Sequence, residues 1–316
     1  MKKIIIIIMA FMLMACSNSG KSDESKEKVT IVTTSFIAYD IATQIAGDKA
    51  EVENILPWGS ELHNFEPTAK NMTAINEADL FIYLSIELEP WLKSNAENDN
   101  ALNLSKSYTL EGHDHHGEEE EKHEHEHESG VHGHDHASLH FWSDPTTYIQ
   151  LIKETQERLS TINPENEEYY EKRAEAYIEA IEILHEEIDE FIHLLENPTI
   201  YFSGHNAMEA FANRYHLTIT SLSDEYRPNA DLTAQQIETL INEIETSGTH
   251  YLFTEELVEP KVAKQMQASL KEKRYDITIL ELHSYHNISK EQSEEGITYE
   301  DLLRQNINNI KQALAN

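Results

Sequence analysis

The segment at residues 164–196 constrains the fold of this chain more than any other. Asn163-Pro164 is typical of a helix start, and no glycine or proline follows until Asn197-Pro198 ends the segment. A helix of roughly thirty residues is about 45 Å long. Because alternating strand and helix patterns lie on both sides of it, we expect one long rigid helix that joins two lobes.

Both flanking regions, at residues 29–163 and 197–316, read as α/β lobes. Short β-branched or apolar runs such as VTIVTT, ADLFIYLS and ITILEL alternate with helical stretches. Nearly continuous apolar runs are typical of buried parallel strands. The sequence therefore predicts the α/β class, with a mostly parallel sheet and flanking helices in each lobe. Residues 87–96 are among the stretches that we expect to be helical.

The N-terminal residues predict secretion and lipid anchoring. Lys2 and Lys3 precede an apolar run of about ten residues, which is shorter than a membrane span and fits a signal peptide at residues 1–15. Leu-Met-Ala before Cys16 resembles a bacterial lipobox, which implies cleavage there and a lipid on Cys16. Residues 16–28 are polar and read as a flexible tether. The expected location is the extracellular face of the cell membrane.

A tract at residues 111–137 is extreme in composition. Nine of the eighteen histidines of the chain lie in it, interleaved with ten acidic residues. Such a run has almost nothing apolar to bury, so we expect a disordered loop that binds several divalent cations weakly. Its histidines are His113, His115, His116, His123, His125, His127, His132, His134 and His136.

The charge and the cysteine content exclude other kinds of site. The formal net charge is −34, and nucleic-acid binding requires basic surfaces, so nucleic acid is not an expected partner. Cys16 is the only cysteine, which excludes a disulfide framework and a thiolate metal site.

Three histidines outside the tract occupy similar places in the strand and helix pattern. His63 follows one expected strand, His205 follows another, and His140 lies between the tract and a helix. Ligands of α/β proteins bind at the carboxyl ends of strands. We therefore expect these three imidazoles to form a metal site.

The motifs around these histidines resemble a known family. LPWGSELHNFEPT, NEADLFIYLSIELEPWL, HFWSDP, SGHNAMEAFANRYHL and EEGITYEDLLRQNINNIKQAL are similar to segments of metal-binding lipoproteins of bacterial ABC uptake systems. The closest similarity is to the zinc-binding AdcA/ZnuA type, and it covers residues 29–316. The resemblance implies that His63, His140 and His205 are metal ligands.

The fourth ligand departs from the family pattern. The family has an acidic residue shortly before a stretch like Ser-Lys-Glu-Glu, and His286 takes that position here. A site with His286 would contain four imidazoles. Glu281 and His283, in the same segment, are the alternatives.

Imidazole ligands favour Zn²⁺, whereas manganese-binding relatives combine two histidines with two carboxylates. The resemblance implies an extracellular receptor, a monomer without enzymatic activity, that binds one Zn²⁺ tightly and delivers it to the permease subunit of an ABC importer. A surface zinc buffer or adhesin, and a receptor for manganese or another divalent metal, are the alternatives. HEHEH at residues 123–127 formally matches the zinc-hydrolase motif, but its polar surroundings indicate a chance match.

Two carboxylates are candidates for orienting the imidazoles. Glu66 lies three residues after His63, and Asp144 lies four residues after His140. A metal-bound histidine usually donates its second ring N–H to such a partner. A carboxylate at a helix start fits the same two positions equally well.

Overall fold

The computed structural model of this chain describes residues 28–92, 95–110, 138–223, 233–257 and 259–315. The expected signal peptide, Cys16 and the histidines of the tract lie outside these ranges. Within them, no helix combines the length and the apolar character needed to span a bilayer.

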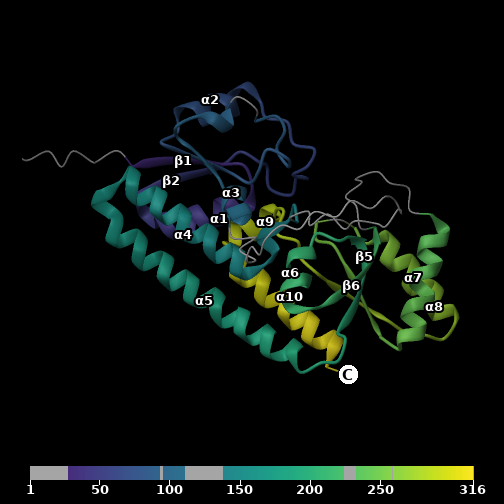
Figure 1. Cartoon of the computed structure of the whole chain (residues 1–316). Coiled ribbons are helices and arrows are strands. Elements are labelled where there is room, and N and C mark those ends of the chain that lie inside the picture. Colours follow the sequence, from purple (N-terminus) through teal and green to yellow (C-terminus); the bar gives the residue numbers. More distant parts are fainter. Residues whose placement is uncertain (1–27, 93–94, 111–137, 224–232, 258, 316) are drawn as a thin grey trace, which may run out of the picture.

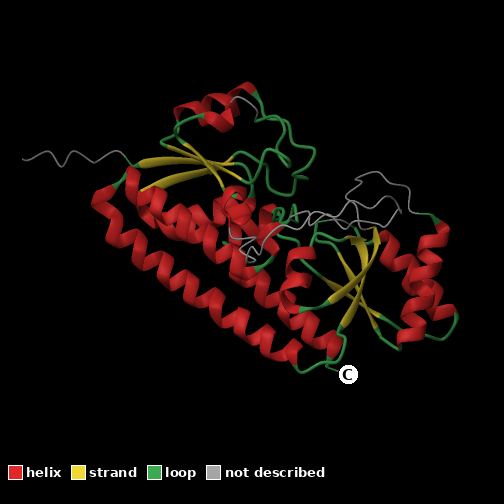
Figure 2. Ribbon diagram, in the orientation of Figure 1, coloured by secondary structure: helices red, strands yellow, loops and turns green. Residues whose placement is uncertain are grey.

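The first lobe contains a four-stranded parallel sheet in the order β2-β1-β3-β4. Its short strands alternate with helices, as Figures 1 and 2 show. The strands are β1 (Val29–Thr33), β2 (Ala50–Asn54), β3 (Leu80–Tyr83) and β4 (Ala101–Asn103), and the helices are α1 (Phe36–Ala46), α2 (Ala69–Glu77) and α3 (Ser105–Leu110).

The second lobe repeats this arrangement with the strand order β6-β5-β7-β8, again all parallel. The expectation of two parallel-sheet lobes is confirmed. The strands are β5 (Thr199–His205), β6 (Thr218–Ser223), β7 (Tyr251–Thr254) and β8 (Thr278–Glu281), and the helices are α6 (Glu209–Tyr215), α7 (Ala234–Ser247), α8 (Lys261–Glu272), α9 (Lys290–Glu295) and α10 (Tyr299–Leu314).

One long helix joins the lobes, as the sequence predicts. It is α5 (Glu167–His193), with 27 residues, and a turn of 3₁₀ helix at Pro164–Asn166 separates it from α4 (Pro145–Ile162). It packs against α1 and α4 of the first lobe and against α6 and α10 of the second. Figure 1 shows it running along both lobes in teal. The lobe boundaries at residues 163 and 197 stay predictions.

Clusters of buried hydrophobic side chains cover both faces of each sheet. One buried cluster is continuous through both lobes and contains residues of α1, α4, α5 and α10. Two smaller clusters cover the opposite faces, one beneath α2 and the other beneath α7 and α8. Parallel sheets are stable when both faces are covered in this way.

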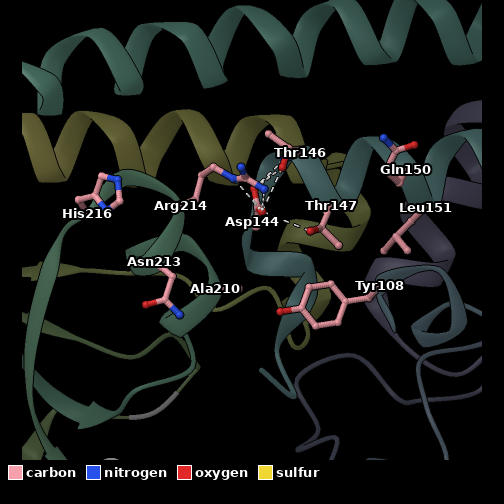
Figure 3. A pocket seen from close by; sticks show the side chains of 10 residues that line it. All are labelled: Tyr108, Asp144, Thr146, Thr147, Gln150, Leu151, Ala210, Asn213, Arg214 and His216. Carbon is pink, nitrogen blue, oxygen red and sulfur yellow. Dashed lines mark hydrogen bonds and ion pairs between the residues drawn. The ribbon is translucent and has the colours of Figure 1, made fainter. Parts of the chain in front are cut away.

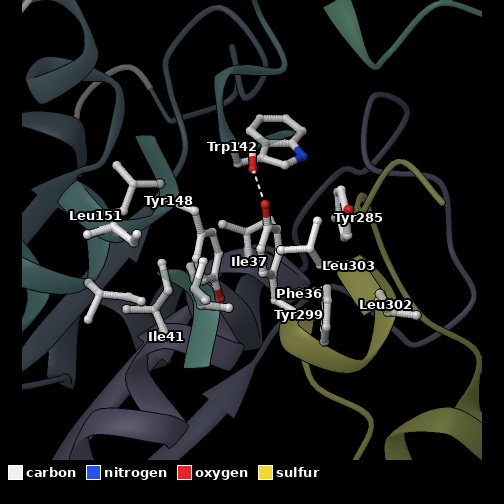
Figure 4. Close-up of a cluster of buried hydrophobic side chains, with 14 of the residues drawn as sticks. Phe36, Ile37, Ile41, Trp142, Tyr148, Leu151, Tyr285, Tyr299, Leu302 and Leu303 are labelled. Atoms are coloured by element: carbon white, nitrogen blue, oxygen red, sulfur yellow. Dashed lines mark hydrogen bonds between the residues drawn. The ribbon is translucent and has the colours of Figure 1, made fainter. Parts of the chain in front are cut away.

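Aromatic rings pack at the centre of the large cluster, where elements of both halves meet. Tyr148 of α4 stacks on Tyr299 of α10 with ring centroids 3.6 Å apart and an angle of 6° between the planes. Trp142, Tyr285 and Phe36 surround this pair (Figure 4). All five side chains are buried. The shared core therefore holds the lobes together beneath the segments that carry the candidate ligands.

The helix expected at residues 87–96 is wrong. The described residues of this stretch form turns and a 3₁₀ helix at Asn95–Glu97. The Glu89 carboxylate accepts hydrogen bonds from the backbone N–H groups of Leu84 and Ser85, at 2.8 and 3.1 Å. This local side-chain bonding competes with helix formation, and Pro90 has no N–H to donate to an earlier carbonyl.

Candidate metal centre

Three histidines from distant parts of the chain converge on one point. Potential ligand atoms of His63, His140 and His286 all lie within 4.8 Å of one another. The ring centroids are 5.7 Å apart for His63 and His140, 5.2 Å for His63 and His286, and 4.7 Å for His140 and His286. Their Nε2 atoms are all shielded from solvent. One cation can therefore contact three imidazoles here.

His63 is carried by the loop between β2 and α2. Leu62 is buried beside it and anchors the loop in the large core cluster. Asn287, from the other lobe, donates hydrogen bonds from its Nδ2 to the carbonyls of Pro57 and Ser60, both at 2.9 Å. These contacts tie the loop of His63 to the loop of His286, so the geometry of this pair depends on both lobes.

His140 lies at the start of a 3₁₀ helix at Phe141–Ser143, directly before α4. Trp142, two residues after His140, is fully buried, and its indole N–H donates a hydrogen bond to the carbonyl of Ser284 at 3.0 Å. The hydroxyl of Tyr299 donates to the carbonyl of Trp142, also at 3.0 Å. A buried aromatic residue with its polar atoms bonded fixes the backbone that presents His140.

His286 lies in the loop between β8 and α9, and hydrogen bonds from α10 hold this loop. The side chain of Asn306 accepts a hydrogen bond from the backbone N–H of His283 and donates to the carbonyl of the same residue, both at 2.8 Å. It also donates to the hydroxyl of Tyr285 at 2.8 Å. Because Asn306 is fully buried, these bonds replace those that water would make and define the loop conformation.

A buried carboxylate lies behind His286. Glu256 accepts hydrogen bonds from both the backbone N–H and the hydroxyl of Ser284. Its Oε1 lies 3.8 Å from Nδ1 of His286 and 3.9 Å from Nδ1 of His283. Burial alone would raise the pKa of Glu256, but the two imidazoles and the hydrogen bonds outweigh it and hold this pKa well below its usual range. The carboxylate is therefore ionised.

The remaining candidate ligands are placed as follows. The backbone of His205 ends β5, and its side chain lies outside the described part of the structure. Glu281 is half-buried, accepts a hydrogen bond from Gln305 and is not in the three-histidine group. His283 is fully buried, its Nδ1 accepts from the N–H of Tyr285 at 3.0 Å, and it is not in that group either.

The carboxylate of Asp144 has the helix-start role, one of the two roles that its position allows. It caps α4 by accepting from the N–H of Thr146 at 2.9 Å, and it pairs with the guanidinium of Arg214 at 2.7 Å. Figure 3 shows this pair at the wall of a cavity of about 510 Å³ between α4 and α6, which none of the three clustered histidines lines. Glu66, the other candidate, is exposed. The helix-start interpretation therefore describes Asp144.

Asp144→Ala is expected to lower the free energy of unfolding by about 1–2 kcal/mol, because α4 loses its N-cap. Urea unfolding of the variant measures this change, and Asp144→Asn, which keeps a capping oxygen, is the matched control. Zinc affinity is expected to stay within a few-fold of the original. A tenfold loss of affinity in the alanine variant alone would instead give Asp144 a part in supporting the metal.

Sequence patterns did not reveal the residues that surround His286. Glu256, Ser284, Asn287 and Asn306 belong to no charge or histidine pattern that separates them from ordinary polar residues. Their contacts arise only when β7, β8 and α10 come together. Only the density of polar residues in the ELHSYHN segment could have marked it as a functional loop.

Comparison with known proteins places this geometry in context. The sequence model of a family described as "Zinc-uptake complex component A periplasmic" (ZnuA) matches residues 31–313. The high-affinity zinc uptake system protein ZnuA of Bacillus subtilis is 30% identical over 322 residues, which cover 98% of this chain and 96% of that protein.

Two further relatives differ in the metal that their names give. The zinc-binding lipoprotein AdcA of Streptococcus pneumoniae is 29% identical over 99% of this chain, which spans only 61% of the length of AdcA. The manganese ABC transporter substrate-binding lipoprotein PsaA of the same species is 27% identical over 99% of both chains.

Solved structures show the same fold. The Zn(II)-bound ZnuA-like domain of AdcA from Streptococcus pneumoniae has a TM-score of 0.72 at 23% identity, over 92% of this chain and all of that one. The periplasmic zinc-binding protein TroA of Treponema pallidum has a TM-score of 0.73 at 18% identity, with the same coverage. These likenesses concern the architecture of the two lobes.

Proposed function

The chain belongs to the ZnuA family of zinc-uptake components, which are substrate-binding proteins and not enzymes, and from this we propose that it captures Zn²⁺ outside the cell. In this proposal, the ion binds between the two lobes and passes to the membrane permease of an ABC importer. The protein performs no chemistry on its cargo. It has only to select, hold and release it.

The observation that supports zinc most directly is the donor set. His63, His140 and His286 offer three imidazole nitrogens within 4.8 Å of one another, and no carboxylate is in this group of described side chains. Imidazole suits Zn²⁺ in a tetrahedral site, whereas Mn²⁺ prefers carboxylate oxygens. We propose that His205, at the end of β5, completes the site with these three. One Zn²⁺ bound to four imidazoles is the resulting site.

A manganese receptor is the second candidate function. PsaA carries manganese in its name and is nearly as similar as the zinc proteins. In this chain the buried carboxylate nearest to the cluster, Glu256, is bonded to Ser284. Since a histidine stands at the position where the resemblance expects an acidic ligand, the donor set favours zinc over manganese.

The other parts of the proposal rest on the sequence and on the names of relatives. AdcA and PsaA are both named lipoproteins, which supports a lipid on Cys16 and a location on the extracellular face of the membrane. The nine histidines at positions 113–136 are proposed to gather further Zn²⁺ weakly near the site. The partner is the permease subunit, and the receptor works as a monomer.

Deleting residues 113–136 is expected to leave one tightly bound zinc per chain, because the three clustered histidines lie outside the deleted segment. Elemental analysis after dialysis against a weak chelator measures this zinc, and competition with excess Mn²⁺ measures selectivity. His250→Ala in the same background is the matched control, since His250 lies outside the cluster and stacks on Tyr275.

Three results would count against the proposal. Loss of all zinc with the deletion would make the tract itself the functional part, as in a surface zinc buffer or adhesin. Retention of manganese in preference to zinc would identify a manganese receptor. Growth of a strain without this protein under zinc chelation tests the transport role, and unimpaired growth would contradict it.

A further inference from the structure

Ser284 lies between a buried carboxylate and the candidate ligand His286. Its Oγ is 2.5 Å from Nδ1 of His286 and also donates to Oε1 of Glu256. All three side chains are buried, with exposed fractions of 7% for Glu256, 3% for Ser284 and 9% for His286. The hydrogen bonds between them are therefore shielded from solvent.

The direction of each hydrogen bond follows from the number of protons. An ionised carboxylate only accepts hydrogen bonds, and a serine hydroxyl has one proton to donate. Glu256 already accepts the backbone N–H of Ser284 at 3.0 Å, so its carboxylate faces two donors from one residue. The hydroxyl proton is therefore directed at Glu256, and the serine oxygen is left to accept from Nδ1–H of His286.

We propose that Glu256 and Ser284 are positioning residues that fix the tautomer of His286, with the proton on Nδ1 and the lone pair of Nε2 directed at the metal. This proposal rests on the proposed function, in which His286 is a ligand. In many zinc sites, a carboxylate hydrogen-bonded to the ligand histidine orients the ring and raises its basicity. Here the hydroxyl of Ser284 takes that role.

The neighbouring histidine has the opposite tautomer, which strengthens the assignment. Nδ1 of His283 accepts the backbone N–H of Tyr285, so its proton is on Nε2. That nitrogen has no lone pair for a metal. The two histidines of this loop thus differ in the hydrogen bond of Nδ1: in His286 it donates to Ser284, and in His283 it accepts from Tyr285.

The ring of His286 is also held from its other side. Trp142 contacts it edge to face with centroids 5.7 Å apart, and the indole N–H of Trp142 binds the carbonyl of Ser284. The same serine therefore connects the segments of His140 and His286. Its hydroxyl sets the protonation of one ligand, while its carbonyl holds the backbone that carries the other.

The test uses the full chain labelled with ¹⁵N-histidine, without metal and with zinc. In the metal-free protein, two-bond ¹H–¹⁵N spectra are expected to show His286 protonated at Nδ1 and His283 at Nε2, with His286→Gln and His283→Gln assigning the signals. Ser284→Ala is expected to move His286 toward the Nε2–H form and to weaken zinc binding by about 10–100-fold.

Further variants separate positioning from folding. Glu256→Gln is expected to shift the His286 tautomer in the same direction as Ser284→Ala, whereas Ser284→Thr keeps the hydroxyl and restores the Nδ1–H form. Thr155→Val is the matched control, because it removes a buried hydroxyl that bonds only the carbonyl of Leu151 within α4. It should change neither the tautomer nor the zinc affinity.

An unchanged His286 tautomer in folded Ser284→Ala, with zinc affinity equal to that of Thr155→Val, would overturn the assignment and leave the receptor function intact. If the original chain binds no zinc at His286, the receptor proposal fails instead. The spectra of the metal-free protein still report the tautomer in that case, so the two failures are distinguishable.

Discussion

His140→Ala is expected to weaken zinc binding by roughly 10²–10³-fold. Structural zinc sites with four ligands have apparent binding free energies of about 10–16 kcal/mol. The share of one ligand is therefore about 2.5–4 kcal/mol, which corresponds to that loss. His140 is 6% exposed and contacts the rings of both other histidines, so water cannot easily replace its imidazole.

Isothermal titration with a competing chelator measures this loss, in the background without residues 113–136 so that weak sites do not mask it. His250→Ala serves again as the control for removing an imidazole. Circular dichroism at the aromatic bands verifies that Trp142 keeps its packing. A folded His140→Ala protein that binds zinc as tightly as the control would remove His140 from the site.

Asp40→Asn is expected to remove a pH-dependent destabilisation of about 3 kcal/mol. Burial raises the pKa of Asp40 from 3.8 to about 6, although Tyr148, Tyr177 and the backbone of Tyr299 donate hydrogen bonds that partly lower it. The bond from Tyr148 is 2.6 Å long. This rise in pKa, from 3.8 to about 6, corresponds to about 3 kcal/mol of free energy.

The sign follows from the raised pKa of Asp40. Below about pH 4 the carboxyl is protonated in both the folded and the unfolded chain, so it has no effect on their difference. Above about pH 6 it is ionised in both states, and the buried charge destabilises the fold. The contribution of Asp40 to stability therefore falls as the pH rises from about 4 to 6.

The measurement is the free energy of unfolding in urea at several pH values, for the original chain and for Asp40→Asn. The difference between the two curves is expected to change by about 3 kcal/mol between pH 4 and 6. A constant offset from altered hydrogen bonds to the amide does not affect this slope. Asp276→Asn, at an exposed position, is the control, and parallel curves for Asp40→Asn would contradict the prediction.

Features that depend on neighbouring residues in the sequence were predictable. The long helix follows from a stretch without glycine or proline, and the buried strands follow from short apolar runs such as LFIY in β3. The three clustered histidines include His63 and His140, which the strand pattern selects, and His286, which only the family resemblance selects. Their roles as ligands stay predictions.

Features that depend on tertiary contacts were not predictable. Asn287 meets Pro57 and Ser60 across 230 and 227 positions of the chain, and Trp142 meets Ser284 across 142. Such pairs leave no periodicity in the sequence. The missing helix at residues 87–96 has a local cause, but the burial of Glu89 that stabilises the alternative is again a property of the folded lobe.

The bracing of the His286 loop by α10 has a consequence for the order in which the site is completed. Chains emerge from the ribosome N-terminus first, and domains generally fold as they emerge. His63 and His140 are then exposed long before Asn306, which fixes the loop of the third imidazole. The contacts of His286 with His63 and His140 join segments that are distant in the sequence, and such contacts form slowly. The cluster of His63, His140 and His286 is therefore complete only when α10 has docked.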